Sequence, residues 1–376
     1  MPRLRRSDCR GPGIHRRRRG RGFSYHWGDG RPVTEPDVLA RIAALVIPPA
    51  WQDVWICPWA NGHIQATGTD AAGRRQYRYH DRWRQARDAA KHEHVLEVAR
   101  ALPKVRATVA EHLRRPGLGR ERVLAAAVRL LDLGFFRVGS DEYAEENGTY
   151  GLATIRKEHV RVAGPAVVFD YPAKGGKEQL RQVVDPDVRE VVAALRRRRG
   201  GSPELLAWRD RQGWHDVGSD DVNAFLRDVA GIPMTAKDFR TWHATVLMAV
   251  ALAVSRHTGH SASARRRAVA RAFREVAGYL GNTPAVCRSS YVDPRVVDLY
   301  HDGVTVAPAL ERLGAGVPPG TLATQGAVEA AVVELLTGTR VGSATTDSTA
   351  TSAPPRTAAV KPKVDKAIRQ WVTSGA

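Results

Sequence analysis

The stretch GNTPAVCRSSY, residues 281–291, contains the end of one helix, the start of another and a tyrosine. Gly281 is suited to end a helix that begins near residue 261, Thr283 can cap the next helix, and Pro284 fits its first turn. Tyr291 then lies on a short helix and is a candidate nucleophile. A free phenol ionises only near pH ~10, so such a nucleophile requires neighbouring cations and a proton acceptor.

Three basic segments precede this stretch: FRVG at 136–139, AKGGK at 173–177 and KDFR at 237–240. In this order, and followed by Tyr291, they resemble the active-site series of the type IB DNA topoisomerases, specifically the compact bacterial and poxvirus-like branch. The resemblance covers roughly residues 13–330, and four segments in the right order make it specific. It implies a metal-independent and ATP-independent isomerase that needs no cofactor.

The net charge of the chain also points to DNA as the partner. The chain of 376 residues has a formal net charge of +19 and an isoelectric point near 10.5. Such a field attracts polyanions, because each neutralised phosphate releases counterions. We therefore expect double-stranded DNA as the partner, although charge alone fits a noncatalytic basic DNA-binding protein equally well.

Other classes of protein are disfavoured. No apolar run is long enough to cross a membrane, so we expect no membrane partner. Three widely separated cysteines, Cys9, Cys57 and Cys287, fit neither a disulfide framework nor a zinc site and indicate a reducing cytoplasm. The resemblance to the bacterial branch implies that this is the cytoplasm of a bacterium, with its nucleoid. The sequence contains no Walker loop and no acidic cluster typical of a magnesium site.

The predicted fold class is α+β, with a small β-rich N-terminal domain and a mainly α-helical catalytic domain that contains a small β-sheet with a hairpin. The first domain, 1–85, begins as a basic arm with four arginines at 16–19 and serves as a DNA clamp. The second spans 86–336, and a Ser/Thr/Ala/Pro/Lys tail at 337–376 is predicted to be disordered. In the first domain we expect a hairpin at 22–30, a helix at 36–46 and strands at 54–57, 62–68 and 74–80.

In the second domain the apolar spacing predicts helices separated by a sheet at 158–184, in which Lys174 lies at the tip of a hairpin. The helix that begins at Thr235-Ala236-Lys237-Asp238 has a capping-box pattern, which places Lys237 and Arg240 on one side of its first turns. The predicted helices are 83–101, 103–114, 120–134, 186–199, 203–208, 219–230, 235–256 and 261–280.

The resemblance assigns roles to the basic residues. Arg137 and Arg240 correspond to the arginines that hold the scissile phosphate, and guanidinium groups suit this task because they present paired donors and stay charged. Lys174 corresponds to the general acid, with Lys177 as its rival. Lys237 resembles a second family lysine that relays the proton or binds phosphate.

Two further predictions concern Asn282 and the choice of the nucleophilic tyrosine. Asn282 lies where the poxvirus members have histidine; its amide can donate a hydrogen bond to a phosphate oxygen but cannot act as an acid or base. Tyr279 and Tyr300 compete with Tyr291 as nucleophile, and the spacing from Asn282 favours Tyr291.

For DNA contacts, the resemblance points to an aromatic pair in the first domain, Tyr77 and Tyr79, and to Tyr143 in the second. Tyrosines two residues apart share one face of a strand. A monomer with two lobes could then close as a clamp around a duplex. The further predicted contacts are Arg74, Arg75, Gln76 and Lys177.

The strongest alternative is a tyrosine recombinase, which shares the Arg, Lys, Arg and Tyr chemistry. Such enzymes usually have histidine two or three residues before the second arginine, where this chain has Lys237, and their N-terminal domain is typically helical. The β-rich N-terminal domain predicted here therefore favours the topoisomerase.

Overall fold

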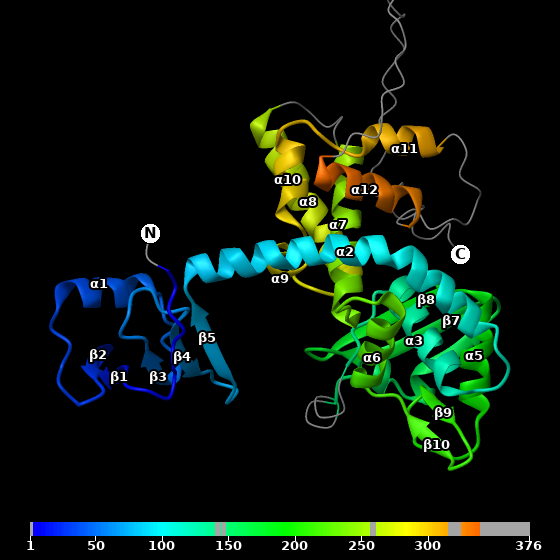
Figure 1. The fold of residues 1–376 in the computed structure, drawn as a ribbon, viewed down its shortest axis with the longest axis horizontal. Helices are drawn as coiled ribbons and strands as arrows, with labels where there is room; N and C mark the ends of the chain where they lie inside the picture. The colour runs from blue at the N-terminus through cyan, green and yellow to red at the C-terminus, as the bar shows by residue number, and fades with distance from the viewer. Residues whose placement is uncertain (1–2, 140–143, 145–147, 256–260, 315–324, 339–376) are drawn as a thin grey trace, which may run out of the picture. The chain divides into compact units, whose positions relative to one another are not determined.

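The structure is a computed structural model, and it describes residues 3–139, 144, 148–255, 261–314 and 325–338. The chain divides into two compact units, Met1–Glu93 and His94–Ala376. The boundary predicted near residue 85 falls inside helix α2 (Asp81–Leu113), which runs through the division (Figure 1). The predicted tail beyond residue 338 lies outside the described residues.

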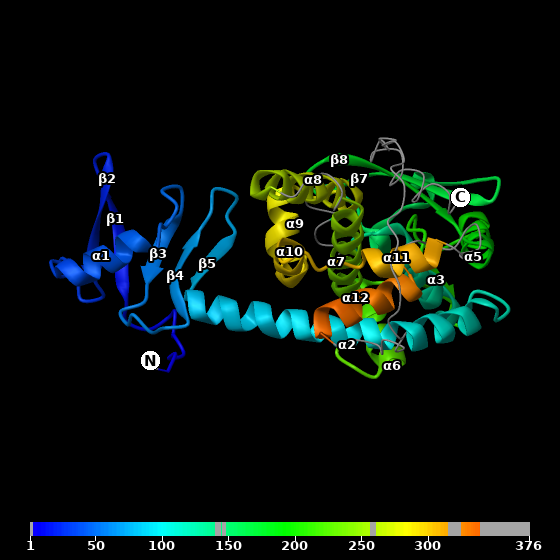
Figure 2. The ribbon, with the colours of Figure 1, turned by 90° about the horizontal axis from the view of Figure 1, so that it is seen from above.

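The N-terminal unit contains a five-stranded antiparallel sheet in the order β2-β1-β3-β4-β5, and Figure 2 shows the strands in this order from left to right. Helix α1 (Pro36–Ala44) contributes Ile42 to a core with Ile14, Val54 and Ile56. The predicted strands and helix are confirmed. The strands are β1 (Ile14–Arg19), β2 (Gly22–Trp27), β3 (Gln52–Ile56), β4 (Ile64–Thr69) and β5 (Arg75–Tyr79).

The four arginines at 16–19 do not form an arm, contrary to the prediction. They lie in β1, which pairs with β2 through a turn at Gly20. The turn predicted after Trp27 is also present, since the Trp27 N–H donates to the Arg31 carbonyl at 2.8 Å and His26 bridges Pro32 in antiparallel fashion. Arg16 donates hydrogen bonds to the carbonyls of Pro48 and Trp51 at 3.1 and 2.6 Å. A guanidinium satisfied by backbone carbonyls can lie in a sheet despite its charge.

Helix α2 is continuous, whereas the sequence predicted a break at Pro103. Proline removes one backbone hydrogen bond and usually kinks a helix. Here Leu102 and Val105, on either side of it, are at most 1% exposed. Burial of this apolar face outweighs the loss of one bond.

The C-terminal unit contains a three-stranded antiparallel sheet of β6 (Val160–Ala163), β7 (Ala166–Ala173) and β8 (Lys177–Val184). The predicted sheet and its hairpin are confirmed. The predicted helix at 203–208 is wrong, because Ala207–Arg209 forms β9 and pairs with β10 (Trp214–Asp216). The rings of Trp208 and His215 stack at 4.1 Å, and this cross-strand contact stabilises the hairpin.

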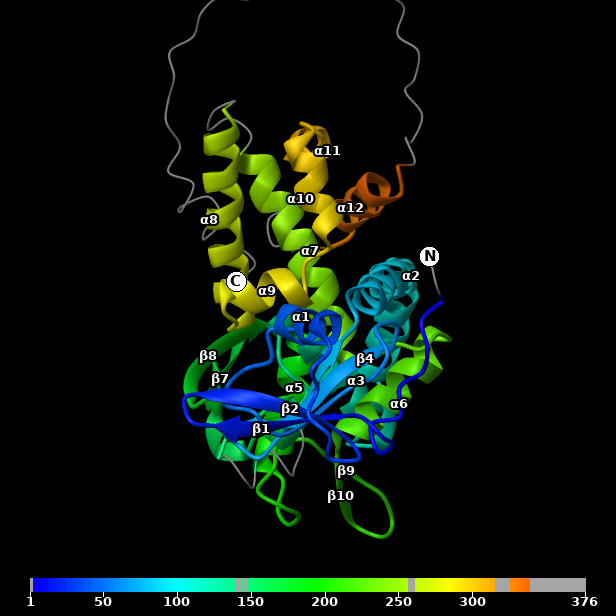
Figure 3. The same cartoon turned by 90° about the vertical axis from the view of Figure 1, so that its left-hand side faces the viewer.

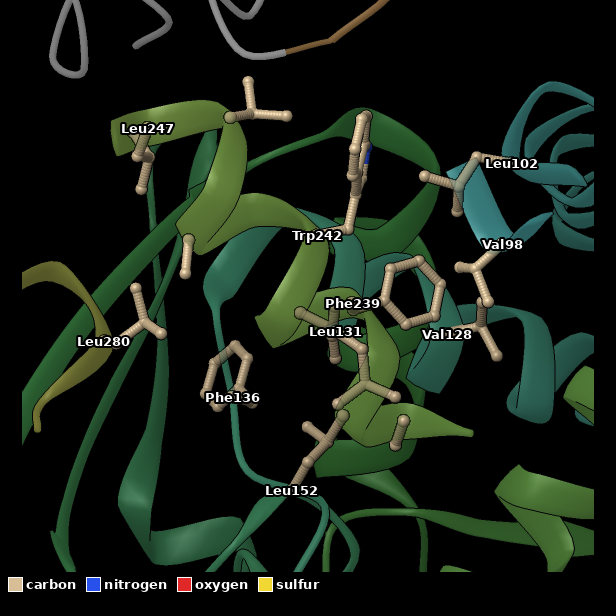
Figure 4. Close-up of a cluster of buried hydrophobic side chains, with 14 of the residues drawn as sticks. Val98, Leu102, Val128, Leu131, Phe136, Leu152, Phe239, Trp242, Leu247 and Leu280 are labelled. Carbon is tan, nitrogen blue, oxygen red and sulfur yellow. The ribbon is translucent and has the colours of Figure 1, made fainter. Parts of the chain in front are cut away.

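Helix α7 (Ala236–Ser255) is the centre of this unit. Almost all of its residues are buried, as expected of a helix surrounded by others, and it contacts α3, α6, α8, α10, α11 and α12. Figure 4 shows Phe239 and Trp242 of α7 facing Leu102 and Val128. The remaining helices are α3 (Arg120–Gly134), α5 (Pro186–Arg197), α6 (Ser219–Ala230), α8 (Ala262–Leu280), α9 (Pro284–Ser290), α10 (Pro294–His301), α11 (Ala307–Gly314) and α12 (Ala327–Thr337).

A buried ionic network links four helices, α2, α3, α7 and α12. Arg106 of α2 donates to both carboxylate oxygens of Asp132 on α3 and to both of Glu329 on α12. From α7, Trp242 donates to Glu329 at 2.7 Å, and His243 lies 3.1 Å from Asp132. Burial raises the pKa of Asp132, but hydrogen bonds from His243 and Arg106 outweigh it, so the pKa is lowered.

Candidate active site

Tyr291 is positioned by the turn between α8 and α9, which follow one another in Figure 3. Gly281 ends α8 with φ +63°, a left-handed conformation that favours glycine, and the hydroxyl of Thr283 accepts from the Val286 N–H to cap α9. Tyr291 closes α9, with its N–H donating to the Cys287 carbonyl at 3.1 Å. The position predicted for the tyrosine is therefore observed.

Arg240 approaches this tyrosine from α7. The start of α7 is fixed by the predicted capping box, in which Asp238 accepts from the N–H and the hydroxyl of Thr235. Although Arg240 is only 3% exposed, its guanidinium carbon lies 5.3 Å from the centre of the Tyr291 ring. The site thus contains a buried cation directly over the phenol.

The pKa of Arg240 is lowered to about 10. Burial is the main cause and the charge of Arg137 adds to it, while Tyr291 opposes the shift. Arg240 still carries its charge at neutral pH. An opposite charge brought into the site would relieve the repulsion between the two arginines.

Arg137 lies after α3 in a segment without regular secondary structure. Gly139 has φ +82°, and a side chain built on Gly151 would place its Cβ only 2.4 Å from the Gly139 Cα. This close backbone approach requires glycine at both positions and fixes the segment that contains Arg137. The Arg137 guanidinium donates to the Gly281 carbonyl at 3.0 Å and to the Asn282 side-chain oxygen.

The two guanidiniums are held by consecutive carbonyls at the C-terminal end of α8. Arg240 donates to the Leu280 carbonyl at 2.7 Å and also to the Phe135 carbonyl, while Arg137 binds the next carbonyl, that of Gly281. The end of a helix carries partial negative charge, which suits cations. The segment that follows α3, the start of α7 and the end of α8 therefore meet, which brings the two arginines together as the sequence predicted, with Arg240 over the Tyr291 ring.

Two buried donors in this cluster have no hydrogen-bond partner among the described residues: Arg240 Nε and Asn282 Nδ2. The orientation of the Asn282 amide is set chemically, because arginine can only donate, so the oxygen must face Arg137 and the nitrogen must point elsewhere. Buried donors are normally paired, and each unpaired one costs about 1–3 kcal/mol. The cluster is suited to bind an anion.

The three predicted lysines are all exposed. Lys174 is exposed in the turn between β7 and β8, where Gly175 and Gly176 have φ of +81° and +67°. Lys177 begins β8 and Lys237 is in the first turn of α7. Both are exposed and make no side-chain hydrogen bond or ion pair with another described residue, so neither is held in the arginine cluster.

The competing tyrosines differ from Tyr291. Tyr300 of α10 is 5% exposed and packs in the core, and Tyr279 is half-buried within α8. Tyr291 is also half-buried, but the Arg240 guanidinium lies over its ring. The environment of the three side chains favours Tyr291.

The sequence prediction missed two residues near the cluster. Arg181 on β8 and Tyr171 on β7 interact electrostatically with Arg137. In a chain with 58 lysines and arginines, no motif distinguished Arg181. Alternation along β8 from the hairpin tip was the one available signal, because it places Gln179 and Arg181 on one face.

In the N-terminal unit, Tyr77 and Tyr79 share one face of β5. They are 46% and 39% exposed, and their rings stack at 6.1 Å between centroids. The other predicted contacts are bonded nearby: Arg74 and Gln76 to Asp70, and Arg75 to Thr67. Tyr143 lies outside the described residues.

A surface pocket of about 600 Å³ adjoins Tyr77. Arg75 and Tyr77 line it from β5, and Arg6 and Arg10, which were not predicted, line it from the N-terminal segment. That segment is fixed to the sheet, since Arg5 exchanges backbone hydrogen bonds with Asn61 and His63. Exposed rings beside arginines form a surface suited to nucleic acid.

In the described part of the chain, no helix is both long and apolar enough to span a membrane.

Comparison with known proteins assigns the family. Residues 80–304 match the family described as eukaryotic DNA topoisomerase I, catalytic core, and residues 22–70 match bacterial DNA topoisomerase IB, N-terminal domain. DNA topoisomerase 1B of Acanthamoeba polyphaga mimivirus is 28% identical over 295 residues, covering 77% of this chain and 88% of that protein. DNA topoisomerase 1B of Vaccinia virus (strain Copenhagen) is 20% identical over 235 residues, covering 62% and 72%. With more than half of its length matched by the catalytic core, the chain belongs to the type IB DNA topoisomerase family.

Proposed function

We propose that Tyr291 is the nucleophile with which this topoisomerase cleaves one strand of duplex DNA. The phenolic oxygen bonds to phosphorus, the bond from phosphorus to the 5′ oxygen breaks, and a 3′-phosphotyrosyl ester forms. Lys174 gives a proton to the departing 5′ oxygen, and the proton of the phenol passes to water. Lys177 is the alternative acid, and Lys237 relays the proton or binds phosphate.

The observation that carries this proposal is the cluster beside Tyr291. Arg137 and Arg240 supply positive charge, and the unpaired Arg240 Nε and Asn282 Nδ2 supply donors. Preorganised donors stabilise charge that develops on the nonbridging oxygens, and they do so without reorganisation during the reaction. The phosphate oxygens would in turn provide acceptors for these donors.

The reaction needs no energy source, because the ester formed resembles in energy the diester that is broken. The 5′ hydroxyl can attack the phosphotyrosine, restore the strand and release Tyr291. Rotation of the free end between the two steps relaxes supercoils of either sign without ATP, metal or cofactor. We propose that the protein acts as a monomer that clamps the duplex, with Tyr77, Tyr79 and Tyr143 on the DNA, in the bacterial cytoplasm.

The test is relaxation of positively and negatively supercoiled plasmid in EDTA without ATP. We expect both plasmids to be relaxed by the full chain, and an SDS quench to trap a covalent adduct. Tyr291→Phe should form no adduct and still bind DNA. If supercoiling is unchanged and no adduct forms, the protein is a noncatalytic DNA-binding protein; strand exchange between two sites would instead indicate a recombinase.

A further inference from the structure

A third arginine lies beside the catalytic pair. Arg181 is on β8 opposite Phe169, and Gln179, two residues earlier, is opposite Tyr171 of β7. Arg181 donates to the Gln179 side-chain oxygen at 2.8 Å. A side chain built on Gly281 would come within 2.9 Å of that same oxygen, so this part of β8 adjoins the end of α8 that holds Arg137.

The charge of Arg181 is not neutralised within the described part of the chain. Arg137, Arg181 and Arg240 form no ion pair there with a carboxylate, and their guanidiniums repel one another. Burial lowers the pKa of Arg181, the nearby Tyr171 opposes this, and the charge of Arg137 lowers the pKa further. Three partly buried cations at one place favour a polyanion as their common partner.

The hydroxyl of Tyr171 lies among these charges. The residue is 4% exposed, and its ring stacks on Phe136 at 6.2 Å between centroids. Burial raises the pKa of its phenol, and Arg181, Arg137 and Arg240 oppose the shift. The hydroxyl forms no hydrogen bond with any described residue, and it is not among the fully buried polar atoms that lack a partner, so it is accessible to a ligand.

We propose that Arg181 and the Tyr171 hydroxyl bind a backbone phosphate of the DNA at the cleavage site, as a second phosphate-binding pair beside Arg137 and Arg240. This inference rests on the proposed function. The competing explanation is that Arg181 acts only as a positioning residue, which orients Gln179 against Gly281. The two explanations differ in whether the effect of a substitution depends on the charge of one DNA phosphate.

The test is single-turnover cleavage of duplex oligonucleotides in which one phosphate at a time is replaced by a neutral methylphosphonate. On ordinary DNA we expect Arg181→Gln to cleave about 100-fold more slowly than the wild-type chain. At one linkage the neutral group should remove this difference, because the contact is already lost. If Arg181→Gln is slowed equally whichever linkage is neutral, or cleaves ordinary DNA at the wild-type rate, Arg181 does not contact a phosphate.

Tyr171→Phe tests the second member without disturbing the packing on Phe136. We expect Tyr171→Phe to cleave ordinary DNA about 10-fold more slowly than the wild-type chain, within the range of one hydrogen bond to a charged group. This difference in rate should vanish when the same linkage is neutral that removes the effect of Arg181→Gln. If the rate difference vanishes at a different linkage, or if Tyr171→Phe cleaves at the wild-type rate, the two residues do not bind the same phosphate. Arg161→Gln, which changes an exposed arginine on β6 of the same sheet, is the control and should cleave normally.

Failure of this inference can be told apart from failure of the proposed function. Wild-type chain that forms no covalent adduct on ordinary DNA contradicts both. Wild-type chain that cleaves, with Arg181→Gln and Tyr171→Phe unaffected, contradicts only the second phosphate-binding pair.

Discussion

The guanidinium of Arg240 shows what a single residue contributes to this site. It is 3% exposed, bonded to the Leu280 and Phe135 carbonyls, and still within 5.3 Å of the Tyr291 ring. The carbonyl oxygens offset the cost of removing the guanidinium from water but leave its positive charge in place, whereas a carboxylate would neutralise that charge. Arg240 can therefore remain a cation that attracts phosphate.

We expect Arg137→Ala and Arg240→Ala to reduce the rate of DNA cleavage by about 100-fold to 1000-fold, since each removes donors to the developing charge. Binding of DNA should be largely retained, because it depends on many phosphate contacts. The measurements are single-turnover cleavage and filter binding.

Arg189→Ala is the matched control, as Arg189 also donates to a backbone carbonyl, that of Gly164, at 2.7 Å. Wild-type cleavage by Arg137→Ala or Arg240→Ala would contradict the assigned roles.

At the scale of the elements, local signals in the sequence predicted most of what was observed. The cap at Thr283, the capping box at Thr235 and the glycine turn after Lys174 are short-range features, and each is present in the structure. Tertiary contacts decided the exceptions. Pro103 is tolerated because its neighbours are buried, and Trp208 is in a strand because it stacks on His215.

The candidate site was predicted less completely. Arg137 and Arg240 could be chosen by their motifs, but the carbonyls of Leu280 and Gly281 that hold them are invisible in a sequence, since every residue has one. Arg181 was missed because only the register of β7 and β8 shows what it adjoins.

The hairpin of β7 and β8 carries the proposed general acid. We expect Lys174→Ala to cleave DNA slowly, and a substrate with a bridging 5′ sulfur in place of oxygen to restore most of the rate, because a thiolate leaves without being protonated. Single-turnover cleavage of both substrates measures this.

Lys177→Ala is the matched comparison on the same hairpin. If the sulfur substrate rescues Lys177→Ala and leaves Lys174→Ala slow, the acid is Lys177 and the assignment of Lys174 is wrong.

The contact of Gly139 with Gly151 supports the segment that contains Arg137. Gly151→Ala would place a Cβ 2.4 Å from the Gly139 Cα, so we expect a loss of about 1–3 kcal/mol in the free energy of unfolding and slower cleavage. Urea denaturation measures the first effect.

Gly278→Ala is the control within α8, where a Cβ would meet nothing within 4 Å, and it should stabilise by about 0.5–1 kcal/mol. A stable Gly151→Ala with normal cleavage would contradict the role of the glycine contact.

At the scale of the whole molecule, the net charge of +19 attracts DNA, while the buried network of Arg106, Asp132 and Glu329 holds the helices of the C-terminal unit together. His243 joins this network three residues after Arg240 on α7. The network therefore stabilises the helix from which Arg240 reaches Tyr291.

We expect Asp132→Asn to lower the free energy of unfolding at pH ~7 by about 3–5 kcal/mol, because it leaves the Arg106 charge without this partner. The pKa of Asp132 is lowered by folding, so its contribution is complete above the unfolded-state value of about 4 and is lost as the pH falls below it. The difference between wild type and Asp132→Asn should thus shrink in acid. Denaturation at neutral and acidic pH measures it, and a difference that does not change with pH would contradict this assignment.

The most direct measurement is to trap the full chain on a suicide DNA substrate, digest the complex and identify the peptide that carries the nucleotide. The account predicts a single phosphotyrosine at Tyr291, in the peptide that follows Gly281. Attachment at Tyr279, Tyr300 or any other residue would contradict it.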